Sequence, residues 1–170
     1  CRIGSMMDRV QEIGQEAIAL TDHGVMYGTI DFYRAAKKAG IKPIVGCEVY
    51  VARRTRFDKV HGVDKEPYHL VLLCENETGY RNLSYMVSLG FTEGFYNRPR
   101  VDMELLKEHH EGLIALSACL AGKLPQLLMQ GDYEGAKKMA LEYKAIFVED
   151  CYLEIQDHGI REQKQINPSL

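Results

Sequence analysis

The sequence lacks several features that would place it in a broad class of protein. Its 170 residues contain no apolar run near the roughly 18 residues that a membrane-spanning helix needs. No basic segment followed by an apolar one opens the chain, so no secretory signal is visible. Repeats, low-complexity tracts and linker-like stretches are also missing. We therefore expect one soluble domain with an ordinary hydrophobic core and no membrane contact.

A strong positive charge is missing as well. The chain carries 21 basic and 24 acidic residues, for a formal net charge of −3. A domain that holds duplex DNA by its overall field is normally strongly basic. Any contact with nucleic acid should therefore be local or made by another domain. The first residue is Cys1 rather than Met and a helical pattern follows at once, so we expect a fragment of a longer protein.

The five cysteines show no CxxC pair, and their spacing matches neither a zinc ribbon nor a secreted disulfide framework. Buried thiols in the reducing cytoplasm are the simplest interpretation, and we apply it to Cys1, Cys74 and Cys151. Cys119 has a different context, because it follows a predicted strand together with other metal-binding residue types.

Helical and strand-like periodicities alternate along the chain. Apolar residues at helical spacing predict helices at 3–13, 29–39, 78–89, 102–109 and 132–147. Short runs rich in β-branched residues predict strands at 17–20, 43–52, 69–74, 112–117 and 151–156. The alternation favours an α/β fold with a parallel sheet. Residues 53–67 are polar, with interleaved charges, and are predicted to be a solvated surface loop.

Two architectures fit this order of elements. An open, doubly wound sheet accommodates five strands in 170 residues as they stand. A closed (β/α) barrel fits only if it is truncated, because a complete one takes about 250 residues. The position of the chemically reactive residues favours the barrel.

Residue types that bind divalent metals are found at or near the ends of all five predicted strands. They are Asp22 and His23 after the first, Glu48 within the second, His69 at the start of the third, Cys119 after the fourth, and Asp157 and His158 after the fifth. Strand ends converge on one face of a parallel barrel, so such residues can meet in space. Imidazole, carboxylate and thiolate together suit zinc, manganese or iron better than calcium or magnesium.

Each of these residues also has a simpler interpretation. Asp22 and Asp157 are common turn formers, and a lone histidine in a turn is usually solvated. Glu48 is harder to explain in this way, because its neighbours form an apolar strand and a buried carboxylate needs a partner. The coincidence of five strands makes a metal site the better hypothesis.

Motifs along nearly the whole chain carry a more specific signal. They are TDHG at 21–24, FYRAAKKAGIKPIVGCEVYV at 32–51, YHLVLL at 68–73, GFTEGFY at 90–96 and GLIALSACLAG at 112–122. Together they resemble the PHP (polymerase and histidinol phosphatase) domain, in the form found in the alpha subunit of bacterial DNA polymerase III (DnaE type).

The resemblance implies a distorted (β/α)7 barrel that holds up to three metals, Zn or Mn, on one face. By motif match His23, Glu48, His69 and Cys119 fall on ligand positions, and Asp22 on a position supporting His23. Asp157 and His158 lie in a family-like segment without an assigned ligand role. The family's opening His-x-His strand and closing Asp-x-His strand are both absent here. The resemblance therefore implies that residues 1–170 are a PHP domain truncated at both ends.

Three functions follow as hypotheses. The first is metal-dependent phosphodiester hydrolysis, a 3′-5′ exonuclease or proofreading activity in which a metal-bound water attacks the phosphorus. The second is a non-catalytic module that braces the polymerase or docks other replisome subunits, including a proofreading subunit or the sliding clamp. The third is a histidinol-phosphatase-like phosphoesterase. No paired aspartates in a palm-like context occur, so nucleotidyl transfer and binding of the DNA template belong to the parent polymerase.

Overall fold

The computed structural model describes residues 2–170, and Cys1 lies outside the described part. The helices are α1 (Ile3–Glu12), α2 (Thr29–Lys38), α3 (Glu77–Thr92), α4 (Met103–Glu108), α5 (Lys123–Met129), α6 (Tyr133–Phe147) and α7 (Arg161–Ile166), followed by the 3₁₀ turn η1 (Asn167–Ser169). The strands are β1 (Ala17–His23), β2 (Lys42–Val51), β3 (Tyr68–Cys74), β4 (Arg100–Val101), β5 (Leu113–Leu116) and β6 (Cys151–Tyr152). The mixed α/β class predicted from the sequence is confirmed.

The expectation of an all-parallel sheet is wrong, because β3 runs against its neighbours. The sheet order is β1-β2-β3-β5-β6, with β4 paired to β2. The pairs β1–β2, β2–β4 and β5–β6 are parallel, whereas β2–β3 and β3–β5 are antiparallel. A parallel connection normally needs a crossover helix. Residues 52–67 between β2 and β3 contain none, so the chain reverses there.

The reversal of β3 decides where its first residues lie. In a parallel sheet, the start of one strand lies at the opposite end from the finish of its neighbour. Because β3 is reversed, its beginning pairs with the end of β2, with Tyr50 opposite His69. His69 therefore lies at the same end of the sheet as His23, the last residue of β1.

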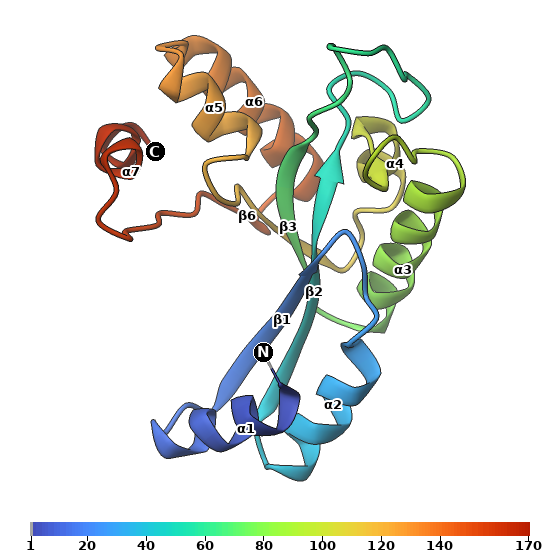
Figure 1. The fold of residues 1–170 in the computed structure, drawn as a ribbon, viewed down its shortest axis with the longest axis vertical. Helices are drawn as coiled ribbons and strands as arrows, with labels where there is room; N and C mark the ends of the chain where they lie inside the picture. Colours follow the sequence, from blue (N-terminus) through green and yellow to red (C-terminus); the bar gives the residue numbers. More distant parts are fainter. Residues whose placement is uncertain (1) are drawn as a thin grey trace.

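Helices cover the sheet in three groups (Figure 1). The strands β1 and β2 form a long arm with α1 and α2 at its far end, over a small core of Met7, Val10, Phe32, Ala36 and Ile41. A larger core joins β2, β3 and β5 to α3, α4 and α6. Within residues 2–170, no helix combines the length and apolarity needed to cross a bilayer. In this described part of the chain, Cys47, Cys74, Cys119 and Cys151 form no disulfide.

Helix starts follow local sequence signals. The side chains of Asn76, Asp102 and Asp132 each accept a hydrogen bond from a backbone N–H three residues later, at the start of α3, α4 and α6. Such caps satisfy donors that have no partner inside the helix. These three signals explain why helices begin near the predicted positions.

The fifth strand is shorter than the predicted 151–156, since β6 contains only Cys151 and Tyr152. The ladder ends because its neighbour β5 ends at Leu116 and the backbone turns away at Ala118, whose φ is 63°. Beyond that point the hydroxyl of Ser117, not a strand, accepts the N–H of Glu154 at 2.8 Å. The following segment leaves the sheet and leads to α7.

The loop between β2 and β3 lies on the surface, as predicted, and most of residues 53–67 are exposed, but Arg56, Asp64 and Pro67 are buried. It is wrapped around Arg100 of β4, whose side chain is fully buried. The Arg100 guanidinium donates hydrogen bonds to four backbone carbonyls, those of Arg56, Asp58, Asp64 and Gly94, at 2.8–3.2 Å. No sequence pattern predicts this arrangement, because the four acceptors are backbone atoms.

Asp64 is the buried acidic partner within this loop, with no exposed side-chain surface. Its carboxylate accepts hydrogen bonds from Nε and Nη2 of Arg54 at 3.1 and 2.6 Å, and from the N–H of Val60 at 2.9 Å. The hydrogen bonds from Arg54 lower the pKa of Asp64 to about 2, against the opposing effect of desolvation. Ionised Asp64 therefore holds the loop together.

The stability of this loop should depend on pH in a definite direction. The pKa of Asp64 is lower in the folded state, so its contribution is complete above about pH 4 and is lost as the pH falls towards about 2. Hydrogen exchange, corrected for intrinsic rates, should show protection at Val60 that falls across this window. In Asp64→Asn the protection should be low at neutral pH and should lack that transition. An exposed control, Asp8→Asn on α1, should behave as the wild type. Equal pH profiles in all three proteins would contradict this role for Asp64.

Candidate metal centre

Three side chains from three strands meet at one end of the sheet. His23 is the last residue of β1 and pairs with Glu48 of β2. Tyr50, two residues beyond Glu48, pairs with His69 at the beginning of β3. Paired residues share a face of a sheet, and residues two apart on one strand do too. His23, Glu48 and His69 therefore project from the same face.

The distances within this group are short. Nδ1 of His23 and Nδ1 of His69 each lie 2.7 Å from Oε1 of Glu48. One ligand atom from each residue falls within 4.8 Å of the others, which makes these three residues a group able to hold a metal ion. The Glu48 side chain is 13% exposed and that of His23 is 68% exposed. The carboxylate is thus held inside while one imidazole faces the solvent.

Cys119 reaches the group from the turn after β5. Its Sγ lies 3.5 Å from Nδ1 of His69. The turn is held against β3, since the N–H of His69 donates to the carbonyl of Ala121 at 3.1 Å. Ala118 precedes the cysteine in the left-handed region, a conformation that an L-residue other than glycine rarely adopts. The backbone conformation of this turn therefore places the Cys119 side chain next to His69.

The charges of the four groups are mutually dependent. Burial alone raises the pKa of Glu48, but hydrogen bonds and charge from His69 and His23 outweigh this, so the net pKa is lowered. The pKa of His69 is raised to about 9 by its hydrogen bonds to Cys119 and Glu48. The hydrogen bond from His69 lowers the pKa of Cys119. The site thus stabilises positive charge between a carboxylate and a sulfur, as a metal ligand set does.

The remaining candidate residues lie outside this group of ligand atoms. Asp22 alternates with His23 along β1 and projects from the other face, where its Oδ2 lies 3.2 Å from the position of a Cβ added to Gly28. Asp157 and His158 are exposed in the segment after β6. Asp157 accepts the N–H of Gly159 at 3.0 Å, and Nδ1 of His158 lies 3.0 Å from Nε2 of Gln163. Within residues 2–170, no hydrogen bond or ion pair joins the side chain of any of the three to His23, Glu48 or His69.

Tyr50 and Gly24 support the histidines, and the sequence analysis assigned neither of them a role. The Tyr50 ring contacts the His69 ring edge-on, with centroids 5.2 Å apart. Gly24 has a φ of +69°, and its N–H donates to the carbonyl of Glu48 at 2.9 Å. A Cβ at Gly24 would lie 2.7 Å from Cε2 of Tyr50. The glycine that follows His23 thus allows β1 to turn without displacing the tyrosine that packs on His69.

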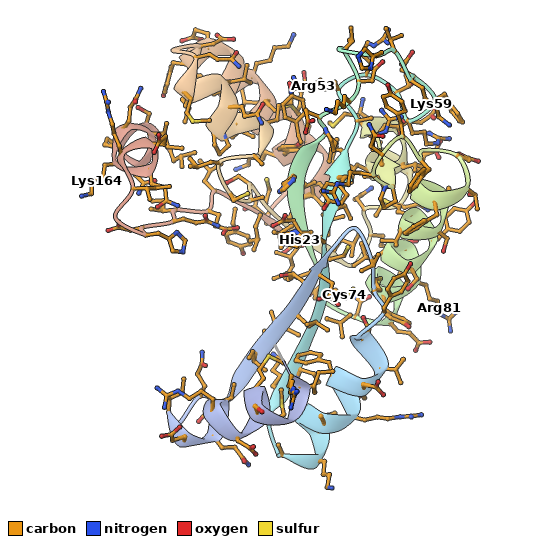
Figure 2. All side chains as sticks on the ribbon, in the orientation of Figure 1. His23, Arg53, Lys59, Cys74, Arg81 and Lys164 are labelled. Atoms are coloured by element: carbon orange, nitrogen blue, oxygen red, sulfur yellow. The ribbon has the colours of Figure 1, made fainter. Side chains whose placement is uncertain are left out.

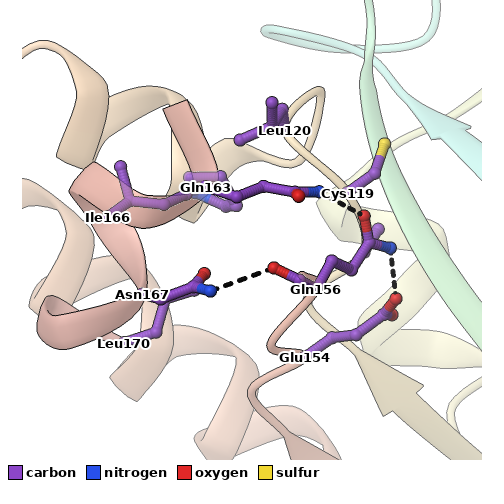
Figure 3. Close-up of a pocket in the computed structure, with 10 residues that line it drawn as sticks. Cys119, Leu120, Glu154, Gln156, Gln163, Ile166, Asn167 and Leu170 are labelled. Carbon is purple, nitrogen blue, oxygen red and sulfur yellow. Dashed lines mark hydrogen bonds between the residues drawn. The ribbon is translucent and has the colours of Figure 1, made fainter. Parts of the chain in front are cut away.

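An open hollow of about 660 Å³ lies over the group, and its walls include His23, Tyr50, Arg53, His69 and Arg98. Figure 2 marks His23 at the end of β1 and Arg53 at the start of the loop after β2. A much smaller cavity of about 10 Å³, room for roughly one water, lies beside Cys119. Figure 3 shows that glutamines and a carboxylate from the chain after β6 fill that region. Of these two spaces beside the group, only the larger has room for more than about one water.

Comparison with known proteins places the chain in a family. The PHP domain family matches residues 1–158. The chain belongs to the PHP family. It is 51% identical over 162 residues to the DNA polymerase III subunit alpha of Treponema pallidum, with 94% of this chain covered. The alpha subunits of Borreliella burgdorferi and Thermus aquaticus are each 45% identical, over 99% and 91% of this chain.

This PHP domain sequence spans 14%, 15% and 13% of the lengths of those three relatives. Among solved structures, an amidohydrolase from Chromobacterium violaceum covers 86% of this chain and 78% of its own, with 14% identity and a TM-score of 0.42. That likeness is too low to support a functional conclusion. The proposal of a function below therefore uses the relatives found by sequence.

Proposed function

We propose that this PHP domain is part of the alpha subunit of a bacterial replicative DNA polymerase III, and that it hydrolyses phosphodiester bonds with the help of divalent metal. The identity to three such alpha subunits over 91–99% of this chain supports the first half. The parent protein would then be a cytoplasmic DNA-directed DNA polymerase. Its partners would be DNA and other replisome subunits, including a proofreading subunit or the sliding clamp.

The convergence of His23, Glu48 and His69 on one point carries the second half of the proposal. Two imidazole nitrogens, a carboxylate oxygen and the nearby sulfur of Cys119 fit zinc or manganese better than calcium or magnesium. These four residues would hold the metal. A bound divalent cation lowers the pKa of water and neutralises charge on a phosphoryl oxygen. Asp22, Asp157 and His158 receive no ligand role here.

The chain's own residues would divide the remaining work. Glu48 contacts both histidines and would hold the two imidazole rings in place at this end of the sheet. His23 is exposed to the hollow and would meet the substrate side of the site. Tyr50 would keep the His69 ring in place, since it packs on the edge of that ring. The hollow above is large enough for a nucleotide-sized group, which pockets of about 300–1,000 Å³ accommodate.

The test is hydrolysis of a 3′-labelled DNA primer by the full-length protein without nucleotides. We expect the 3′ end to be shortened, the reaction to stop after chelation, and Zn²⁺ or Mn²⁺ to restore it. A full-length protein that is replete with metal and yet leaves the primer intact would contradict the hydrolytic function. That result would favour a domain that only braces the polymerase or docks its partners.

A further inference from the structure

The wall of the hollow carries positive charge although the whole chain is acidic. Arg53 and Arg98 both line it, together with the histidines of the candidate metal group and one acidic residue, Glu66. The Glu66 carboxylate lies 3.8 Å from Nζ of Lys65. Among the ion pairs of the described residues, none includes either arginine. The hollow therefore contains the candidate metal-binding histidines and two guanidinium groups that form no ion pair with the described residues.

The two arginines differ in whether their donors are engaged. Nε of Arg53 donates to the carbonyl of Glu66 at 2.7 Å, and its Nη1 donates to the hydroxyl of Tyr68 at 3.0 Å. Its guanidinium is also stacked on the Tyr68 ring. Arg53 thus ties the loop to β3. The Arg98 side chain makes no hydrogen bond to the described residues, so all of its donors are available to a ligand.

Arg98 is nevertheless held in a definite place. Its guanidinium carbon lies 5.5 Å from the centroid of the Tyr50 ring, the ring whose edge contacts His69. The backbone is fixed on both sides. Asn97 adopts a left-handed φ of 60°, and Pro99 follows. The N–H of Tyr96 donates to the carbonyl of Arg98 at 3.1 Å. A short turn with a defined backbone conformation therefore places Arg98 beside the candidate metal-binding residues.

We propose that Arg98 is a substrate-binding residue of this site and contacts a phosphate oxygen of the phosphodiester held above His23 and His69. A guanidinium presents paired N–H groups that match the oxygens of a phosphate, and it stays charged at every working pH. Stacking on Tyr50 leaves these edge donors free while the ring limits their motion. This inference rests on the proposed hydrolytic function and names the residue that would recognise its anionic substrate.

If Arg98 had only a structural role, packing against Tyr50, different substitutions would be tolerated. If Arg98 served only to cover the Tyr50 ring, a long apolar residue would replace it at little cost. Arg98 is exposed, and an exposed cation over an aromatic ring contributes only about 0.5–1 kcal/mol. Arg98→Met and Arg98→Lys therefore separate the two roles. Methionine keeps the cover and loses the charge, whereas lysine keeps the charge and loses the paired donors.

The experiment measures binding and turnover separately in the full-length protein. Calorimetry with inorganic phosphate, on zinc-loaded protein, measures anion binding without reaction. Hydrolysis of bis(p-nitrophenyl) phosphate gives KM and kcat. The matched control is Arg81→Met, because Arg81 is an exposed arginine of α3 paired only with Glu77. The melting temperature of each variant reports whether the fold is retained.

For Arg98→Met we expect phosphate affinity to fall roughly 10- to 100-fold, the size of a lost hydrogen-bonded charge pair. KM should rise by a similar factor with a smaller change in kcat, and Arg98→Lys should recover part of the loss. Arg81→Met should match the wild type. Unchanged phosphate affinity in a folded Arg98→Met variant would overturn the proposal, whether or not the protein is an enzyme.

The hydrolytic function and the role of Arg98 in phosphate binding are contradicted by different results. If phosphate binding depends on Arg98 but no variant hydrolyses the diester, the anion site stands and the hydrolytic function falls. If the wild type hydrolyses the diester and Arg98→Met does so with the same KM, the function stands and the role of Arg98 falls.

Discussion

Glu48→Gln in the full-length protein is expected to lose most of its bound metal and to slow primer hydrolysis on the order of 10²- to 10³-fold. The reason is geometric, since a single carboxylate oxygen lies 2.7 Å from both histidine nitrogens. The amide keeps the shape of the side chain but removes the negative charge that offsets the cation. Without that charge, two imidazoles and a thiol form a weaker site.

The control for this variant is the same substitution, glutamate to glutamine, at a position outside the site. Glu77 begins α3 and its exposed carboxylate pairs with Arg81. Glu77→Gln should keep the full metal content and rate, because exposed pairs of this kind contribute about 0.3–0.5 kcal/mol. Metal content is measured by elemental analysis after gel filtration, and rate by release of the labelled 3′ nucleotide. A Glu48→Gln protein that retains metal and activity would remove Glu48 from the site.

Arg100→Met is expected to loosen the loop between β2 and β3 by about 3–5 kcal/mol. The substitution keeps most of the apolar stem but leaves four carbonyls without their donor in a buried setting. Each unsatisfied buried group costs about 1–3 kcal/mol, and entry of water as the loop opens offsets part of the sum. Asp64 would also lose the charge of Arg100, which helps to keep the pKa of its carboxyl low.

Hydrogen exchange over residues 53–66 measures this effect within the full-length protein. Protection should fall roughly 10²- to 10³-fold or more in Arg100→Met. Amides of the distant α1 and α2, which have their own core, should keep their protection. Arg81→Met again provides the exposed control. If the loop amides of Arg100→Met stay as protected as in the wild type, the buried guanidinium is not what holds the loop. Because Arg53 and Glu66 line the hollow, a loosened loop should also weaken phosphate binding.

Much of the site could be predicted because its chemistry is local to strand ends. His23 and Cys119 follow apolar runs, and Glu48 interrupts one, so each stands out within a few residues of sequence. The positions of helices and strands were predicted for the same reason. Apolar periodicity and cap residues such as Asp102 act over one or two turns of chain.

The direction of β3 was not predicted, although a signal was present. A connection of fifteen residues or so without helical periodicity favours reversal over a parallel crossover. The prediction placed His69 at the site for the wrong geometric reason, since an all-parallel sheet would have carried it to the other end. Its reversal is what brings His69 opposite Tyr50.

The remaining differences come from contacts between residues far apart in sequence. Arg100 is buried because the loop folds over it from 36 to 44 residues away, and no local pattern marks such a partner. The β5–β6 ladder ends where the backbone turns away at Ala118, and the next contact, from the N–H of Glu154, goes to the Ser117 hydroxyl 37 residues away. Asp157 and His158 therefore lie outside the sheet. The position of Arg98 likewise depends on a contact with Tyr50, which is 48 residues away in the sequence.

The central claim is that His23, Glu48 and His69 hold one metal ion between them. Anomalous diffraction at the zinc or manganese absorption edge, from crystals of the full-length protein soaked in that metal, tests it directly. We predict an anomalous peak within coordination distance, about 2.0–2.3 Å, of a nitrogen of each histidine and an oxygen of Glu48. The absence of a peak at this end of the sheet, with metal bound elsewhere in the protein, would contradict the claim.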